Sequence, residues 1–298
     1  MSVFNKVILI LSFFGMWISH IISEDNLIVL GYFLILSFGI FHGANDLELI
    51  QKNNTINNKG NSKNKIRFLI SYIISVLFFS VCFYFFPLIG FIIFMVISAY
   101  HFGEQHLNFK VYDSLNLNIL AFRFFYGSLI LSILLFFHKE EVSKIILNIT
   151  SFEVKSILFN YILILTIAFT ILFYFLSKNY MSKDFFIFFE VFLLIVFSLI
   201  FKFSPLIWGF SLYFILWHSI PSIKSQSEFI YGEFSYLTFI KYLKSGFLIW
   251  LLSIVSFILY FYLMKNNSML ETILFSFIAA ITFPHVFTIF NIFQKKTE

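Results

Sequence analysis

Hydrophobic residues fall along the chain in long runs, and short polar segments separate these runs. A membrane-spanning helix needs about 20 mostly apolar residues, so each run is a candidate span. The pattern predicts an all-α fold, a polytopic transmembrane helix bundle of about ten helices, with eight or nine as alternatives, in a single integral membrane domain over residues 1–298. The ten candidate spans are Val7–Ile22, Leu27–Phe41, Arg67–Phe86, Pro87–Tyr100, Leu117–Phe137, Ile157–Leu176, Phe185–Phe201, Leu206–Ile220, Phe247–Met264 and Leu270–Phe290.

The polar segments between the spans differ in character. Gln51–Lys65 is a low-complexity, basic stretch that predicts a flexible loop, and His138–Lys155 is long enough to hold a surface helix. Lys224–Lys244 is a third polar connection, with aromatic residues suited to a membrane interface. Only Pro87 separates the third span from the fourth.

Composition supports lipid as the main solvent of this chain. Hydrophobic residues make up 60% of it and charged residues only 12%, whereas a soluble domain needs about a quarter of its residues charged. The single cysteine, Cys82, excludes an intramolecular disulfide and a cysteine-ligated zinc or iron–sulfur site. The net charge of +5 lies in loops, so it indicates topology rather than nucleic-acid binding.

The basic residues predict an orientation. With ten helices and an N-terminus inside, about fifteen of the 20 basic residues fall on the inner side. Both termini are then expected in the cytoplasm. Lys6 and the apolar run after it resemble a signal peptide, but no small-x-small cleavage site follows, so we expect a first membrane helix.

Four of the seven histidines lie at or near the ends of even-numbered spans: His42 directly after the second, His101 directly after the fourth, His218 in the eighth and His285 in the tenth. Even-numbered spans all run in the same direction, so these histidines are expected at one membrane depth, near the cytoplasmic side. A polar side chain at such depth is costly and usually marks function. Neutral imidazole binds iron, copper, nickel and zinc, and we expect one shared metal site.

The alternative for any single histidine is an ordinary hydrogen-bonded residue near a helix end. Four such cases at one depth favour the shared site, whereas His20 and His138 are interpreted as interfacial residues. His106 remains open between a partner of a metal ligand and a loop residue. Asp46 and Glu104 lie one turn from a histidine and are candidates to accept a hydrogen bond from a ligand imidazole.

Four short segments carry these histidines and resemble the spaced motifs of the Brp/Blh family, in the family's order. They are HGANDLE at 42–48, SAYHFGEQ at 98–105, LWHSIPS at 216–222 and FPHV at 283–286. The first two together are fairly specific, and the last two are weak alone. The resemblance implies a multi-pass bacterial membrane enzyme that cleaves β-carotene at its central 15,15′ double bond with O2, giving two all-trans-retinal molecules.

The resemblance also implies an Fe(2+) cofactor held by histidines, in the bacterial inner membrane, with a retinal-binding rhodopsin as a possible acceptor of the product. His42, His101 and His218 match the family's ligand positions. Ser222 stands where some members have a further histidine, which leaves the fourth ligand open. His285 is the substitute we expect, with His106 behind it.

Such a substrate is wholly apolar, and its extended length is close to the ~30 Å hydrocarbon thickness of a bilayer. Its pocket is expected to be apolar and aromatic. Candidates near the histidines are Phe41, Tyr100, Phe102 and Trp217, although core or lipid-facing packing is the other interpretation of each.

Two other functional classes remain. A di-iron desaturase or hydroxylase is similar in being a histidine-rich membrane oxidase, but it needs about eight histidines in clusters such as HxxxH, and this chain has seven and no such cluster. A transporter can use intramembrane histidines as a proton relay, but it often shows paired halves, which the sequence lacks.

Overall fold

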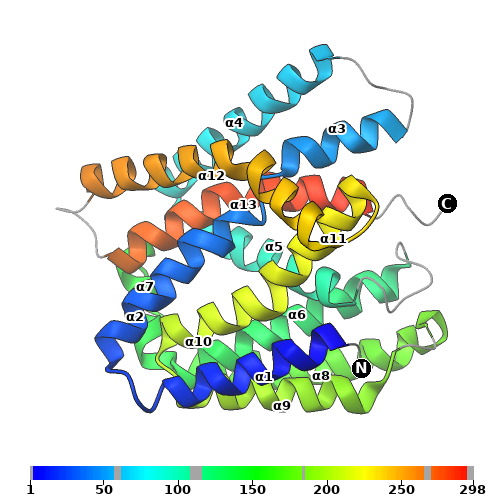
Figure 1. Ribbon diagram of the computed structural model, residues 1–298. Helices are drawn as coiled ribbons and strands as arrows, with labels where there is room; N and C mark the ends of the chain where they lie inside the picture. Colours follow the sequence, from blue (N-terminus) through cyan, green and yellow to red (C-terminus); the bar gives the residue numbers. More distant parts are fainter. Residues whose placement is uncertain (1–2, 57–61, 108–115, 183–184, 265–269, 294–298) are drawn as a thin grey trace.

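A computed structural model describes residues 3–56, 62–107, 116–182, 185–264 and 270–293. Over these residues the chain is helical throughout and contains no strand (Figure 1). The elements are α1 (Val3–Ile18), α2 (Glu24–Leu34), η1 (Ile35–Gly39), α3 (Asp46–Ile56), α4 (Ser62–Phe85), α5 (Pro87–Leu107), α6 (Leu117–Phe137), α7 (Lys139–Thr150), α8 (Ile157–Ser177), η3 (Lys178–Tyr180), α9 (Ile187–Phe203), α10 (Leu206–Tyr213), η4 (Phe214–Ser219), α11 (Ile220–Tyr231), α12 (Tyr236–Met264) and α13 (Leu270–Phe293).

The all-α, polytopic class predicted from the sequence is confirmed. Each of the ten apolar runs overlaps a helix, and among the described residues seven helical segments are long and apolar enough to cross a membrane. The seven segments are Ile66–Phe85, Pro87–Leu107, Leu117–Phe137, Ile157–Tyr180, Leu206–Tyr231, Tyr236–Leu263 and Ile273–Phe293. Helix α1 is apolar but shorter.

Two polar segments contain more helix than their composition suggests. Residues 51–56, predicted to be loop, form the end of α3, because Leu49 is fully buried against Phe229, Ile289 and Ile292 and anchors that helix. The rest of that predicted loop lies partly outside the described residues. The predicted connection at 224–244 is mostly helical as well.

Helix α11 ends at Tyr231, and the next residue, Gly232, has a φ of 91°, the left-handed conformation that glycine adopts readily. Helix α12 already begins at Tyr236. The connection between them is therefore four residues long, 232–235. The helix expected between 138 and 155 is present as α7.

The prolines beside the histidines, Pro221 and Pro284, do not break their helices. Helix α13 continues through Pro284, and the continuous helical segment Leu206–Tyr231 contains Pro221, two residues after the end of η4. The irregular backbone takes another form. A π-helical turn, η1, ends three residues before His42, and a second, η4, contains His218. Single π-helical turns inside helices are frequent at functional sites.

Helices α5 and α6 cross in very close contact near His101. A Cβ atom at Gly103 would clash with the backbone carbonyl of Arg123, and one at Gly127 would clash with that of Ala99. Glycine at both positions lets the two backbones meet. This contact fixes the half of α5 that carries His101 against the middle of the bundle.

Candidate metal centre

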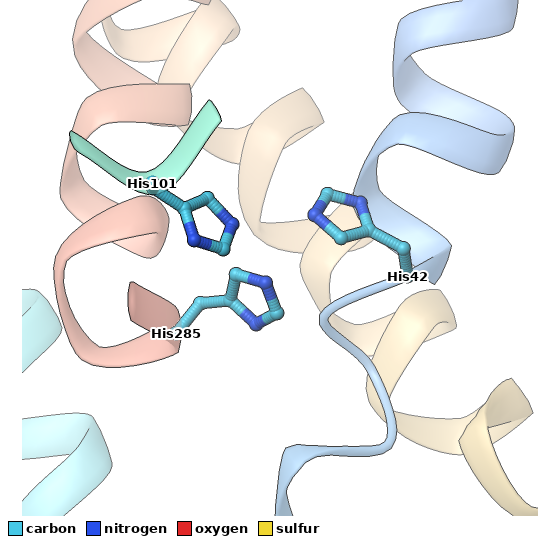
Figure 2. A group of neighbouring side chains, drawn as sticks. All are labelled: His42, His101 and His285. Carbon is cyan, nitrogen blue, oxygen red and sulfur yellow. The ribbon is translucent and has the colours of Figure 1, made fainter. Parts of the chain in front are cut away.

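Four histidines from four separate parts of the chain meet in the interior. Ring centroids lie 4.7 Å apart for His42 and His285, 5.3 Å for His285 and His101, 4.8 Å for His101 and His218, and 5.1 Å for His218 and His42. Each of the four imidazoles therefore has two of the others as close neighbours. Figure 2 shows three of them, His42, His101 and His285, converging on one point from different segments. All four are buried.

Their nitrogen atoms fit a metal ion. His42, His101 and His285 each offer one nitrogen, and these three atoms lie within 4.8 Å of one another. Both nitrogens of His101, and Nε2 of His218 and of His285, are buried without a hydrogen-bond partner among the described residues. A buried polar atom without a partner costs about 1–3 kcal/mol. Coordination of one cation by His42, His101 and His285 would satisfy one of the two His101 nitrogens and Nε2 of His285.

Two of the imidazoles are oriented by hydrogen bonds from the nitrogen that faces away from the centre. His42 Nδ1 donates to the Gly39 carbonyl at the end of η1. His285 Nδ1 lies 2.9 and 3.0 Å from the two carboxylate oxygens of Asp46, and Tyr72 donates to the same carboxylate at 3.0 Å. Each bond fixes a ring and leaves Nε2 for a metal, as is usual for metal-bound histidine.

Asp46 is the residue through which the turn after η1 contacts α13. It is buried, and burial raises the pKa of its carboxyl above the ordinary value, although the nearby His285 partly opposes this shift. Gly43 lies in the same turn, where an added Cβ would be 3.4 Å from His285 Nδ1. The HGAND segment therefore supplies both His42 and the partner of His285.

The other two histidines are held differently. Gln105 Nε2 donates to the backbone carbonyl of His218 at 2.5 Å, which links α5 to η4. Glu104 Oε2 lies 4.0 Å from His101 Nδ1, too far for a hydrogen bond. Glu104 is nevertheless buried in the same turn of α5. Of the polar residues expected near the histidines, Asp46 makes the direct contact.

A buried polar network supports the site from the side of α12. Tyr242 donates to Gln226 Oε1 at 2.7 Å and contacts the His42 carbonyl at 3.2 Å. Gln226 in turn donates to Ser222 Oγ at 2.9 Å, and Asn45 donates to the Tyr242 carbonyl at 3.0 Å. Ser222, the position where some Brp/Blh members have histidine, is thus part of this network.

His106 lies in a different cluster. Its Nε2 is 2.8 Å from Glu190 Oε2, and Tyr126 donates to that same oxygen at 2.9 Å. These contacts join α5, α6 and α9 rather than the four-histidine centre. Glu190 is buried and paired with His106.

The four aromatic candidates for a substrate pocket separate into two groups. Phe102 packs against His218, with ring centroids 4.7 Å apart, and lines the cavity that reaches the histidines. The other three pack elsewhere. Phe41 contacts Tyr242 and Trp250, Tyr100 contacts Phe290, and Trp217 donates to Ser12 at 2.8 Å.

The cavity that reaches all four histidines, here called the histidine cavity, has a volume of about 90 Å³. Its walls are otherwise mostly apolar. Beside the histidines it is lined by Ile35, Gly39, Ile40, Gly43, Ala44, Tyr72, Phe94, Ser98, Phe102, Phe210, Phe214, Ile249, Ser253, Ile278, Ile281 and Thr282. The arrangement therefore presents a cluster of imidazoles to a mostly apolar space, which suits metal chemistry on an apolar molecule.

Sequence reasoning did not find Tyr72, Gln226 or Tyr242. Tyr72 is one of several aromatics in an apolar helix, and nothing local distinguishes it. Gln226 and Tyr242 lie in a segment that was interpreted as a polar connection. A signal exists only for Gln226, since a glutamine one turn after Ser222 on a helix is placed to bond with it.

Comparison with known proteins gives one match. The family model described as beta-carotene 15,15'-dioxygenase matches residues 33–292, which include all four histidines. No curated protein and no solved structure matches significantly.

Proposed function

Because the chain belongs to the beta-carotene 15,15'-dioxygenase family, we propose that it cleaves β-carotene at its central double bond with O2, giving two molecules of all-trans-retinal. Family membership implies a carotene dioxygenase. The observation that carries the finer proposal is the ring of four buried histidines, with unpartnered nitrogens, on an apolar cavity.

His42, His101, His218 and His285 are the proposed ligands of one Fe(2+). Imidazole alone also suits copper, nickel and zinc, so the choice of iron follows from the family's reaction with O2. Four protein ligands leave open positions on an ion that accepts six. The bound iron would supply the activation of O2, which organic side chains cannot provide.

The chain's own residues hold the reactants and exclude water. In the reaction the central C=C bond breaks and each carbon gains one oxygen atom of O2, so no external reductant is needed. No proton has to be moved in this balance, and the Asp46 carboxyl group accepts a hydrogen bond from His285. Phe102, Phe210 and Phe214 provide apolar walls against which a polyene can lie.

We further propose that the protein resides in a bacterial inner membrane with both termini in the cytoplasm. The seven long apolar segments support a membrane location. β-Carotene dissolves in the apolar layer, so the protein can take it from the lipid. A retinal-binding rhodopsin in the same membrane is the acceptor we expect for the product.

Expression in a β-carotene-producing bacterium tests the function. We expect loss of orange colour and appearance of retinal in pigment extracts. A matched culture that carries the His101→Ala variant should stay orange. Unchanged pigment with folded, iron-containing wild-type protein would reject the proposal.

Metal content separates this function from a di-iron desaturase or hydroxylase. One iron per purified chain agrees with a single ring of four histidines. Two irons per chain would favour the di-iron class. Retinal formation in vitro by the purified protein with O2 excludes a transporter as the explanation of the pigment change.

A further inference from the structure

A second cavity adjoins the histidine cavity and is here called the deep cavity. Its volume is about 150 Å³, and its lining is almost wholly apolar. The two cavities share six lining residues: Ile35, Phe94, Ser98, Phe102, Phe210 and Ile278. They are therefore neighbouring compartments with common walls.

Three helices show that the two cavities follow one another along the bundle. On α5 the lining passes from Phe91 and Met95 in the deep cavity to His101 in the histidine cavity. On α13 it passes in the same direction, from Leu274 to His285. The segment α10–η4 repeats this order, with its first residues on the deep cavity and His218 on the histidine cavity.

The far end of the deep cavity has a definite floor. Val142 and Ile146 on α7 line it and are 5% and 4% exposed. Leu131, Leu134 and Leu135 at the end of α6 complete it. Helix α7 thus closes the cavity with one face and leaves Leu147, 43% exposed, on another.

The length of the lining along α5 and α13, from the deep cavity to the histidines, matches one half of the substrate. Phe91 precedes His101 by ten residues and Leu274 precedes His285 by eleven, which is about 15 to 17 Å of helix. Extended β-carotene is about as long as the ~30 Å apolar thickness of a bilayer, so half of it is about 15 Å.

We propose that the deep cavity binds one half of β-carotene with its terminal ring against α7, and that this depth selects the central double bond for cleavage. The inference rests on the proposed function and adds the residues that set the position of the cut. Val142 and Ile146 are specificity-determining residues that touch the terminal ring rather than the reacting carbons.

Two substitutions on the floor test the depth. Val142→Phe makes the deep cavity shallower. A double bond nearer the inserted terminal ring should then face the histidines, and its cleavage should give two aldehydes of unequal length. Ile146→Ala makes the cavity deeper and should also give unequal aldehydes. Leu147→Phe is the matched control, because it adds bulk to α7 outside the deep cavity, and it should give only retinal. Chromatography with mass detection measures the chain lengths.

A second readout does not depend on turnover. Metal-stripped protein in detergent is mixed with β-carotene and passed through a size-exclusion column, and the retained pigment is measured by absorbance. Val142→Phe should lower retention several-fold, and Leu147→Phe should leave it at the wild-type level. If Val142→Phe does not fold, Ile146→Ala decides the question through its products.

The outcomes distinguish the two proposals. Equal retinal from both floor variants, with wild-type pigment retention, overturns the depth inference and leaves the proposed function standing. Absence of retinal from folded, iron-loaded wild-type protein rejects the proposed function itself.

Discussion

His285 depends for its position on a residue that is distant in sequence but close in space. Asp46 holds the ring through Nδ1 at 2.9 Å and is itself held by Tyr72. This arrangement keeps Nε2 of His285 directed away from the carboxylate, toward the other rings. At the residue scale, His42 and His285 are therefore oriented by a hydrogen bond from Nδ1, which leaves Nε2 of each free to bind a metal.

Asp46→Asn should weaken iron binding about 10- to 100-fold, because loss of a hydrogen-bonded partner of a ligand histidine typically has an effect of this size. The amide keeps the shape of the side chain but removes its charge. Tyr72→Phe removes only a bond to the carboxylate and should have a smaller effect. Iron retained at increasing chelator concentrations measures both, and equal retention by Asp46→Asn and wild type would contradict the assigned role.

Replacement of His42 or His218 by alanine should abolish retinal formation and reduce bound iron, because each removes a proposed ligand. Iron per chain in the purified protein measures the loss. His106→Gln is the control, since His106 contacts Glu190 and Tyr126 instead, and it should keep its iron. Full activity in His42→Ala or His218→Ala would remove that residue from the proposed site.

The residues brought to the centre could be predicted from sequence because histidines are few and each stands near the end of an apolar run. Their common depth followed from helix direction alone. The partners of those histidines were harder to predict. Asp46 is four residues from His42 but hydrogen-bonds to His285, a pairing across 239 positions that spacing cannot reveal.

At the scale of elements, two of the helical segments that lead to or carry histidines contain a π-helical turn. Each turn widens one helix just before or around a proposed ligand, at Ile35–Gly39 and Phe214–Ser219. The hydrophobic pattern did not predict these π-helical turns, because a continuous apolar run is compatible with both an α-helix and a π-helix. The irregular backbone of the His218 segment lies before Pro221 rather than at it.

The crossing of α5 and α6 is the contact that most tightly limits the position of His101. Gly103→Ala should destabilise the protein by about 1–3 kcal/mol, the usual cost of overpacking, since its Cβ would meet the Arg123 carbonyl. A lower melting temperature in detergent measures this. Gly209→Ala on α10 is the matched control, because an added Cβ there meets atoms at 3.4 Å and beyond. Equal melting temperatures for the two variants would contradict the tight crossing.

At the scale of the whole molecule, the histidines and α7 lie toward opposite ends of the two adjoining cavities. The order of lining residues on α5, α10–η4 and α13 runs from α7 to the histidine centre in each case. The basic residues predicted the histidine end to face the cytoplasm, and α7, with its lysines, to face the other side. The orientation stays a prediction, which rests on a charge bias summed over the loops, whereas the two cavities depend on packing that no local pattern encodes.

Labelling of single cysteines tests that orientation. The background is Cys82→Ala, which removes the chain's one native thiol, and the probes are Lys52→Cys on α3 and Lys144→Cys on α7, both exposed positions. A membrane-impermeant maleimide added to intact inner-membrane spheroplasts should label Lys144→Cys and leave Lys52→Cys unlabelled until the membrane is broken. Labelling of Lys52→Cys alone would reverse the proposed topology and place the histidines near the outer face. The proposals on iron binding and on the depth of the deep cavity would then be unaffected, because both depend on contacts within the bundle and not on which side faces the cytoplasm.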